Sequence, residues 1–284
     1  MWLHALLCLL LPGAAMCFRL MMSYDYLRGD NKVYSQTILK ESIESTRLML
    51  KTPATQRLIE IEFPVNRKND LSAAETLDQS RDFALNFIQG FASEYKKDMW
   101  VVFPDRKEAS LARKKWGENL PFVLSSIEGA TLQVSTTQDR PKLIVAVTPG
   151  FNINEWIDLS LFYDKLSKDA CPIIVINGNL DRLRNGYYPS IFYPGLTKVS
   201  NSFYKRFDQA LFLSPIALSG NRFAAWLIKE YKENCWNIVV KDSENQYQSI
   251  ETYASPPDSG AVWRLAKVQR KTLLITLSFT FNSF

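Results

Sequence analysis

Histidine is nearly absent from this sequence of 284 residues, in which His4 is the single imidazole. It lies in an N-terminal run that we expect to be removed, so the remaining chain cannot form a Ser-His-Asp or Cys-His catalytic site or a His-ligated metal site. Cysteine is scarce too. Cys171 and Cys235 are the two that follow this run, too few for a zinc site or a disulfide scaffold. Their apolar neighbours predict two small core residues.

Glycine-rich nucleotide motifs are also missing. Neither G-x-G-x-x-G nor G-x-x-x-x-G-K-S/T occurs, so the sequence does not support a dinucleotide site or a P-loop. The net charge of +5 is modest for this length and does not indicate a nucleic-acid binder. We therefore expect no catalytic residue, no metal and no cofactor, and we expect a binding protein rather than an enzyme.

The N-terminus has the organisation of a secretory signal. An apolar run broken by Pro-Gly is followed by small residues up to Cys17, which predicts a signal peptide over residues 1–17. Phe18 comes directly after the expected cut. Small residues before the cut and Phe after it resemble the bipartite plastid presequence of algae with secondary plastids. Residues 18–32 are therefore expected to form a plastid transit segment, and an ordinary secretory signal is the alternative.

Apolar runs without polar alternation recur along the chain, between segments with helical periodicity. Strands of this kind are buried on both faces, as in a parallel sheet flanked by helices. The expected strands are RLIEIEFP, MWVVFPD, KLIVAVTPG, CPIIVING, QALFLSP and WNIVV. The expected helices cover residues 33–50, 70–90, 106–117 and 154–166, a segment around Phe203, and residues 221–233. Ser72 and Glu75 have the spacing of a capping box at the start of the second helix.

This order of elements predicts the fold class. We expect a single doubly wound, three-layer α/β domain over residues 33–252 with a mostly parallel sheet, Rossmann-like but without the dinucleotide fingerprint. Residues 122–134 have a weaker pattern, and Gly129 is expected to turn a small hairpin there. Residues 253–284 do not fit the domain: YASPPDSG is typical of a closing linker, and the apolar tail after it is either an added edge strand or a gene-model artefact.

Six segments carry a resemblance to a known family. They are LDQSRDFALNFIQGF, MWVVFPDRKEASLARKKWG, TPGFN, PIIVINGNL, FYKRFDQALFLSPI and WLIKEYKENCWNIV, in this order. The ordered set, over about residues 33–240, resembles a plastid domain of unknown function found in proteins of the low-photosystem-II-accumulation type and fused to some chloroplast adenylate kinases. The resemblance implies a plastid protein, some of whose relatives assist assembly of photosystem II. It implies no catalytic residues, and it favours the plastid interpretation of Phe18.

Polar residues follow several of the expected strands. In an open α/β sheet, ligands bind outside the carboxyl ends of the strands, so these residues are candidate ligand-binding groups. The candidates are Asp105, Arg106, Asn152, Asn177 and Asn179. Together they would suit a phosphorylated metabolite or a nucleotide, as an enzyme or a sensor. The alternative at each position is a residue that caps a helix or forms a turn.

The segment RLRNGYYPSIFYPGL is unusually rich in aromatic side chains for a loop. Aromatic and arginine side chains are favoured anchors at protein interfaces, so the segment predicts a partner-binding surface. The candidates are Arg182, Arg184, Tyr187, Tyr188, Phe192 and Tyr193. The alternatives are a lid that packs its own aromatic side chains and a contact with a membrane interface.

A basic patch precedes this loop in the chain, on the expected helix over residues 106–117. It is either a solvated face or a contact with an anionic thylakoid surface. We expect a protein of the plastid stroma or the peripheral thylakoid that binds a photosystem II subunit or assembly factor and no nucleic acid. The alternative is the small-ligand enzyme or sensor described above.

Overall fold

The computed structural model describes most of the chain between residues 31 and 257. The described residues are 24, 27, 31–52, 57–65, 72–150, 152–166, 171–184, 187–218, 222–231, 235–241, 246–257 and 260. The predicted signal peptide, Phe18 with most of the predicted transit segment, and the tail beyond residue 260 lie outside the described residues.

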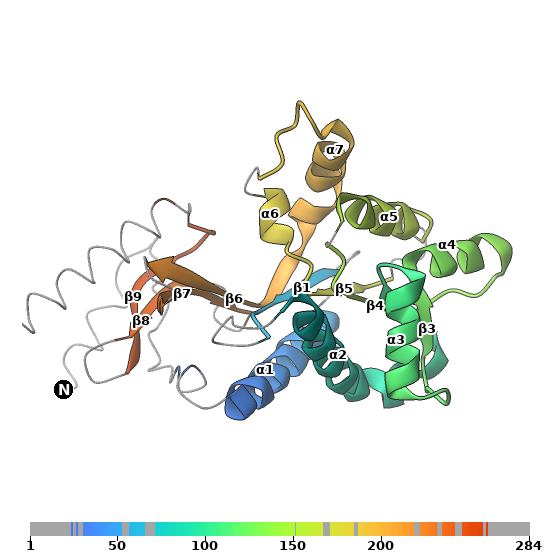
Figure 1. Ribbon diagram of the computed structural model, residues 1–284, viewed down its shortest axis with the longest axis horizontal. Helices are drawn as coiled ribbons and strands as arrows, with labels where there is room; N and C mark the ends of the chain where they lie inside the picture. The colour runs from blue at the N-terminus through green and yellow to red at the C-terminus, as the bar shows by residue number, and fades with distance from the viewer. Residues whose placement is uncertain are drawn as a thin grey trace, which may run out of the picture.

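Within the described residues, nine strands form one open, mixed sheet in the order β3-β2-β4-β5-β1-β6-β7-β8-β9 (Figure 1). The strands are β1 Leu58–Glu62, β2 Met99–Phe103, β3 Val123–Ser126, β4 Leu143–Val147, β5 Ile173–Ile176, β6 Asp208–Leu218, β7 Arg222–Glu230, β8 Cys235–Lys241 and β9 Tyr247–Tyr253. The first six are parallel, and β7, β8 and β9 extend the sheet in antiparallel pairing. The predicted α/β class with a mostly parallel sheet is confirmed.

Helices cover both faces of the parallel half, as Figure 1 shows for α1 and α2 below the sheet and α5, α6 and α7 above it. They are α1 Asn31–Lys51, α2 Ala73–Tyr95, α3 Arg106–Trp116, α4 Ile127–Thr136, α5 Ile153–Asp164, α6 Leu180–Arg184 and α7 Pro194–Ser202. The predicted capping box starts α2, because the Ser72 hydroxyl accepts from the Glu75 amide at 3.3 Å and the Ser72 amide donates to the Glu75 carboxylate at 2.8 Å. None of the described helices is long and apolar enough to cross a membrane.

Two apolar cores lie on the two sides of the sheet. On one side, Phe83, Phe87 and Phe91 of α2 belong to a cluster with strand residues such as Val145. On the other side, Trp156 and Phe162 of α5 belong to a cluster with strand residues such as Ile144. Every residue of β2, β4 and β5 is buried, which is the reason that these strands read as unbroken apolar runs. Cys171 and Cys235 are buried, as predicted.

The helix predicted over residues 221–233 is wrong, because residues 222–230 form strand β7. Ala225, Trp226 and Ile228 have spacing that fits either a helix or a strand. The tertiary structure decides: β7 lies between β6 and β8 and pairs with both, so burial of the backbone hydrogen bonds in the sheet outweighs a local helical preference. The strand β9, after the predicted last strand, is a further element that the pattern did not reveal.

The hairpin predicted around Gly129 is also wrong. Residues 123–126 form the parallel edge strand β3, and α4 begins directly after them. The Ser126 hydroxyl accepts a hydrogen bond from the Gly129 amide at 3.0 Å and thereby caps α4. Gly129 therefore lies in the first turn of a helix rather than in a reverse turn.

A buried ion pair joins the centre of the sheet to α6. Glu60 on β1 is fully buried, and the guanidinium of Arg184 donates to one of its carboxylate oxygens at 2.6 Å. The Gln209 amide of β6 donates to the same oxygen at 2.9 Å. Arg184 also donates to the carbonyls of Tyr204 and Phe207, at 3.2 and 3.4 Å, just before β6. Burial nevertheless raises the pKa of Glu60, against the lowering effect of Arg184 and Gln209.

This pair generates a stability prediction. Replacing Arg184→Met leaves the Glu60 carboxylate buried without its cation, and we expect the free energy of unfolding at neutral pH to fall by about 3–5 kcal/mol in a denaturant titration. The loss should be smaller at low pH, where Glu60 takes up a proton. Adding Glu60→Gln to the same chain should restore much of the stability. Arg182→Met, an exposed change on the same helix, is the control and should have an effect within about 0.5 kcal/mol. Equal losses for the two arginine variants would contradict the role of the pair.

Candidate functional site

The order of the strands creates a crevice at one edge of the sheet. Strands β1 and β5 are parallel neighbours, but the chain leaves β1 toward α2 on one face and leaves β5 toward α6 on the other. The helices that follow the two strands therefore diverge. In open α/β sheets, ligands bind outside the carboxyl ends of the strands at such a change of direction.

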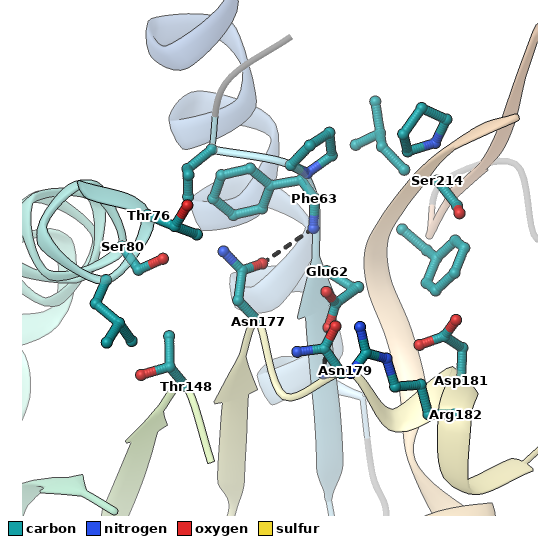
Figure 2. Close-up of a pocket in the computed structure, with 16 residues that line it drawn as sticks. Glu62, Phe63, Thr76, Ser80, Thr148, Asn177, Asn179, Asp181, Arg182 and Ser214 are labelled. Carbon is teal, nitrogen blue, oxygen red and sulfur yellow. Dashed lines mark hydrogen bonds between the residues drawn. The ribbon is translucent and has the colours of Figure 1, made fainter. Parts of the chain in front are cut away.

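A cleft of about 370 Å³ lies at this point (Figure 2), and we call it the switch-point cleft. It is lined by Glu62, Phe63, Pro64, Val65, Thr76, Leu77, Ser80, Thr148, Asn177, Asn179, Asp181, Arg182, Phe212, Leu213, Ser214 and Pro215. A smaller cleft of about 210 Å³ adjoins it and shares Leu77 and Thr148 with it. The remaining lining of the smaller cleft is Pro104, Asp105, Glu108, Asn152 and Glu155.

Three non-glycine residues in the lining have left-handed backbone: Thr148 with φ 49°, Asn177 with φ 51° and Asn179 with φ 52°. Asparagine tolerates this conformation, but it is strained for a β-branched residue such as Thr148. Hydrogen bonds between neighbouring strand ends hold it. The Thr148 amide donates to the Ile176 carbonyl and the Asn177 amide donates to the Ile61 carbonyl, both at 2.8 Å. These two hydrogen bonds join the ends of β4, β5 and β1 to one another.

Hydrogen bonds to side chains also link these strand ends. The Asn177 carboxamide oxygen accepts from the Phe63 amide at 3.0 Å, and the Asn179 amide donates to a Glu62 carboxylate oxygen at 2.9 Å. Figure 2 shows Asn177 between two groups of side chains, with Thr76, Ser80 and Thr148 on one side and Glu62, Asn179, Asp181 and Arg182 on the other. The cleft therefore has a neutral end and an end that carries ionisable groups.

Glu62 is the most perturbed of these ionisable groups. Burial raises the pKa of its carboxyl well above the ordinary value, and the neighbouring carboxylates Glu60 and Asp181 raise this pKa further. The hydrogen bond from the Asn179 amide and the charge of Arg184 lower it, but they do not offset the burial. Glu62 therefore holds its proton at pH values where an exposed glutamate is ionised.

Four of the five predicted ligand residues lie in these clefts. Asn177 and Asn179 line the switch-point cleft, and Asp105 and Asn152 line the smaller one. Asp105 and Asn152 also cap helices, accepting from the amides of Glu108 at 2.8 Å and of Asn154 at 3.1 Å. The fifth residue, Arg106, is exposed and pairs with Glu128 at 2.7 Å outside the clefts. Both the ligand-site hypothesis and the capping alternative thus fit Asp105 and Asn152.

Glu62, Ser80 and Asp181 also line the cleft, and the sequence pattern did not predict them. A signal for Glu62 was present, because Glu60 and Glu62 are charged residues in a short strand whose other three residues are apolar, which is unusual. Ser80 carried no such signal, since a serine within an amphipathic helix is ordinary and only the packing of α2 directs it to the cleft.

The predicted partner-binding residues separate into two groups. Residues 187–193, which we call the aromatic loop, connect α6 to α7 and expose Tyr187, Ile191 and Phe192 at 68%, 81% and 75%. Tyr193 is less exposed, at 37%. The Arg182 guanidinium lies 5.9 Å from the centroid of the Tyr187 ring. The remaining two members of the predicted set point inward.

Tyr188 and Arg184 have structural partners instead. Tyr188 is half-buried and packs edge-on against the Trp156 ring, with the centroids 5.8 Å apart. Arg184 belongs to the buried pair with Glu60. The structure therefore brings the exposed aromatic side chains and Arg182 together, and it places Arg184 on the other side of α6.

A comparison with protein-family models identifies a domain in this chain. The family model described as "Domain of unknown function (DUF1995)" matches residues 35–264, which is most of the chain. No curated protein matches the sequence.

The raised pKa of Glu62 predicts a dependence of stability on pH. The folded state binds the Glu62 proton more tightly than the unfolded chain, so this contribution to stability is complete below the unfolded pKa of about 4.5 and is lost as pH rises through the folded value. Glu62→Gln keeps an oxygen for the Asn179 amide and cannot ionise. We expect the variant to lose less stability than the parent between pH 5 and pH 8, as measured by urea titrations. Glu94→Gln, an exposed change on α2, is the control and should leave the pH profile as in the parent. Parallel profiles for the parent and Glu62→Gln would refute the prediction.

Proposed function

This chain belongs to the DUF1995 family, and we propose that it is a plastid protein that binds a protein partner at the thylakoid surface through its aromatic loop. The partner that we propose is a photosystem II subunit or assembly factor. This finer identity, and the proposed link to proteins of the low-photosystem-II-accumulation type and to the adenylate kinase fusions, rest on the ordered sequence segments that resemble the plastid family.

The observation that carries the proposal is the exposure of bulky apolar side chains in one short loop. Tyr187, Ile191 and Phe192 are each more than two-thirds exposed, within six residues of one another. Leaving such side chains in water costs about 1.5–3 kcal/mol each relative to burial. A cluster of this kind on a surface is typical of an interaction site, and aromatic side chains are common among the residues that contribute most to binding.

The loop is held in shape by its neighbours, which favours binding. The amides of Phe192 and Tyr193 donate to the Pro189 carbonyl at 3.0 and 3.1 Å, forming a turn at the tip. Tyr188 anchors the base of the loop on Trp156, and Pro194 begins α7. A surface that is already ordered loses less conformational entropy when it binds a partner.

The surroundings of the loop indicate the chemistry of the partner. A hollow of about 290 Å³ lies next to it, lined by Tyr188, Ser190, Thr197, Asn201 and Lys205 among others. Arg182 stands beside Tyr187 on the other flank. These groups suit a partner segment with apolar side chains for the loop and an acidic side chain for the hollow.

A double substitution tests the loop. Ile191→Ser with Phe192→Ser removes the two most exposed side chains, which have little to lose in the folded state, so we expect a melting temperature within about 2 °C of the parent. Binding to isolated thylakoids, measured by sedimentation, should weaken by at least about 30-fold, which is the effect of losing a single anchor worth about 2 kcal/mol. Leu132→Ser with Leu161→Ser, which changes exposed leucines of α4 and α5, is the matched control and should bind as the parent does.

The same assay separates a protein partner from a lipid surface. Binding should disappear after the thylakoids are treated with trypsin, and it should be weak on vesicles of thylakoid lipids. Undiminished binding to the lipid vesicles would overturn the proposal in favour of a membrane contact.

The proposed plastid location has its own test. A fluorescent protein fused to residues 1–51 should enter the plastid, and Phe18→Ala should leave the reporter in the outer plastid compartments or the secretory route. Phe18→Tyr keeps an aromatic side chain after the cut and should restore import. Microscopy that finds the Phe18→Ala reporter inside the plastid would contradict the role of Phe18.

A further inference from the structure

We propose that the switch-point cleft is a binding site for a small uncharged molecule that carries hydroxyl or amide groups. This site is separate from the aromatic loop and adds a second function to the proposed one. The proposed ligand is uncharged, whereas the residues at the strand ends predicted a phosphorylated compound.

The cleft has the size and the construction of a ligand site. Its volume of about 370 Å³ lies in the range that holds small organic ligands, and the adjoining smaller cleft extends it past Leu77 and Thr148. Its walls come from α2, from the ends of β1, β4 and β5, from the start of α6 and from β6. Side chains far apart in sequence therefore converge on one volume.

Two largely buried residues turn hydroxyl groups without a protein partner toward this volume. Ser80 and Thr148 are 1% and 8% exposed, and within the described residues no hydrogen bond joins either hydroxyl to another group. Neither oxygen is fully enclosed by protein, so without a ligand each can hydrogen-bond to water in the cleft. In Figure 2 both lie on the same side of the cleft as the Asn177 amide group. A ligand with its own hydroxyl or amide groups would satisfy the two hydroxyls.

Asn177 supplies a donor of fixed orientation to the same end. Its carboxamide oxygen accepts from the Phe63 amide at 3.0 Å, so the position of the side chain is set and its NH₂ group lies on the side of Ser80. The neutral end thus presents two hydroxyls, which both donate and accept, and one amide donor. None of these groups carries a charge.

The ionisable groups of the cleft do not suit an anion. Among the lining residues that the structure describes, Arg182 is the one cation, and it lies beside the carboxyl groups of Glu62 and Asp181. Arg106, which could have added a second cation, is exposed and bound to Glu128 outside the cleft. A phosphate would meet as much repulsion as attraction here, and phosphate sites in proteins are normally built from several cations or from backbone amides.

The rest of the lining suits the carbon skeleton of such a ligand. Phe63, Leu77, Phe212 and Pro215 offer apolar surface between the polar groups. A lining that is largely apolar with a few placed hydrogen-bonding groups is typical of sites for small organic molecules. A hydroxylated ring or a primary amide has both parts.

The experiment uses the whole chain labelled with ¹⁵N and four probes, followed by amide NMR. D-Glucose and acetamide test uncharged hydroxyl and amide ligands, and inorganic phosphate and methylammonium test the two charges. We expect glucose or acetamide to shift the amide signals of Phe63, Thr148 and Asn177, and phosphate and methylammonium to leave them in place. Shifts with a charged probe alone, or no localised shift with either uncharged probe, would overturn the proposal.

Matched variants connect the shifts to the hydroxyls. Ser80→Ala with Thr148→Val removes both hydroxyls and keeps a similar shape, so the binding of the uncharged probe should be about tenfold weaker. The melting temperature should stay the same or rise, because no protein hydrogen bond is lost. A large fall in melting temperature with unchanged probe binding would show that the hydroxyls are structural.

Ser110→Ala with Thr136→Val, two exposed changes on α3 and α4 outside the clefts, is the control and should leave probe binding unchanged. The cleft variant should still bind thylakoids, and the loop variant should still show the probe shifts. The two proposals can therefore fail independently.

Discussion

The carboxyl group of Glu60 lies fully buried at the centre of the sheet, and Arg184 supplies the cation that compensates its charge. Both proposed binding surfaces depend on this ion pair. Arg184 donates to this carboxylate from the last residue of α6 and also to the carbonyls of Tyr204 and Phe207, so one guanidinium joins β1, α6 and the entry to β6. A buried carboxylate without its cation would be strongly unfavourable, so α6 has little freedom to move from the sheet. The position of α6 in turn sets two surfaces: its first turn lies at the switch-point cleft, and its end leads into the aromatic loop.

Trp156 of α5 gives these two surfaces a second common support. Its indole N–H donates to the Gly178 carbonyl at 2.9 Å, next to Asn177 and Asn179 at the cleft, and its ring packs against Tyr188 at the base of the aromatic loop. The turns are in close contact here, because a Cβ atom on Gly150 would lie 2.5 Å from the Gly178 carbonyl oxygen. The proposed ligand site and the proposed partner surface are therefore separate but rest on the same rigid elements.

Much of the fold could be predicted from local patterns. The unbroken apolar runs identified the buried parallel strands, and the spacing of Ser72 and Glu75 identified the start of α2, because burial on both faces and the capping of free amides leave direct traces in sequence. Strand β7 and Ser126, which caps α4, were not predicted, because their local sequence patterns fit more than one structure. Ala225, Trp226 and Ile228 fit two periodicities, and only the pairing with β6 and β8 selects the strand.

The sequence by itself determined the class of fold and the edge of the sheet where Asp105, Asn152, Asn177 and Asn179 gather, because residues that end parallel strands must meet at one edge. Only the tertiary structure decided which side chains face the cleft or the solvent. Arg182 and Arg184 are two residues apart, yet one borders the cleft and the other pairs with Glu60 in the interior. Ser80 and Glu62 come from different elements and line one cleft only when α2 packs on the sheet. Direction and burial of a side chain follow from packing between distant segments, which spacing along the chain does not encode.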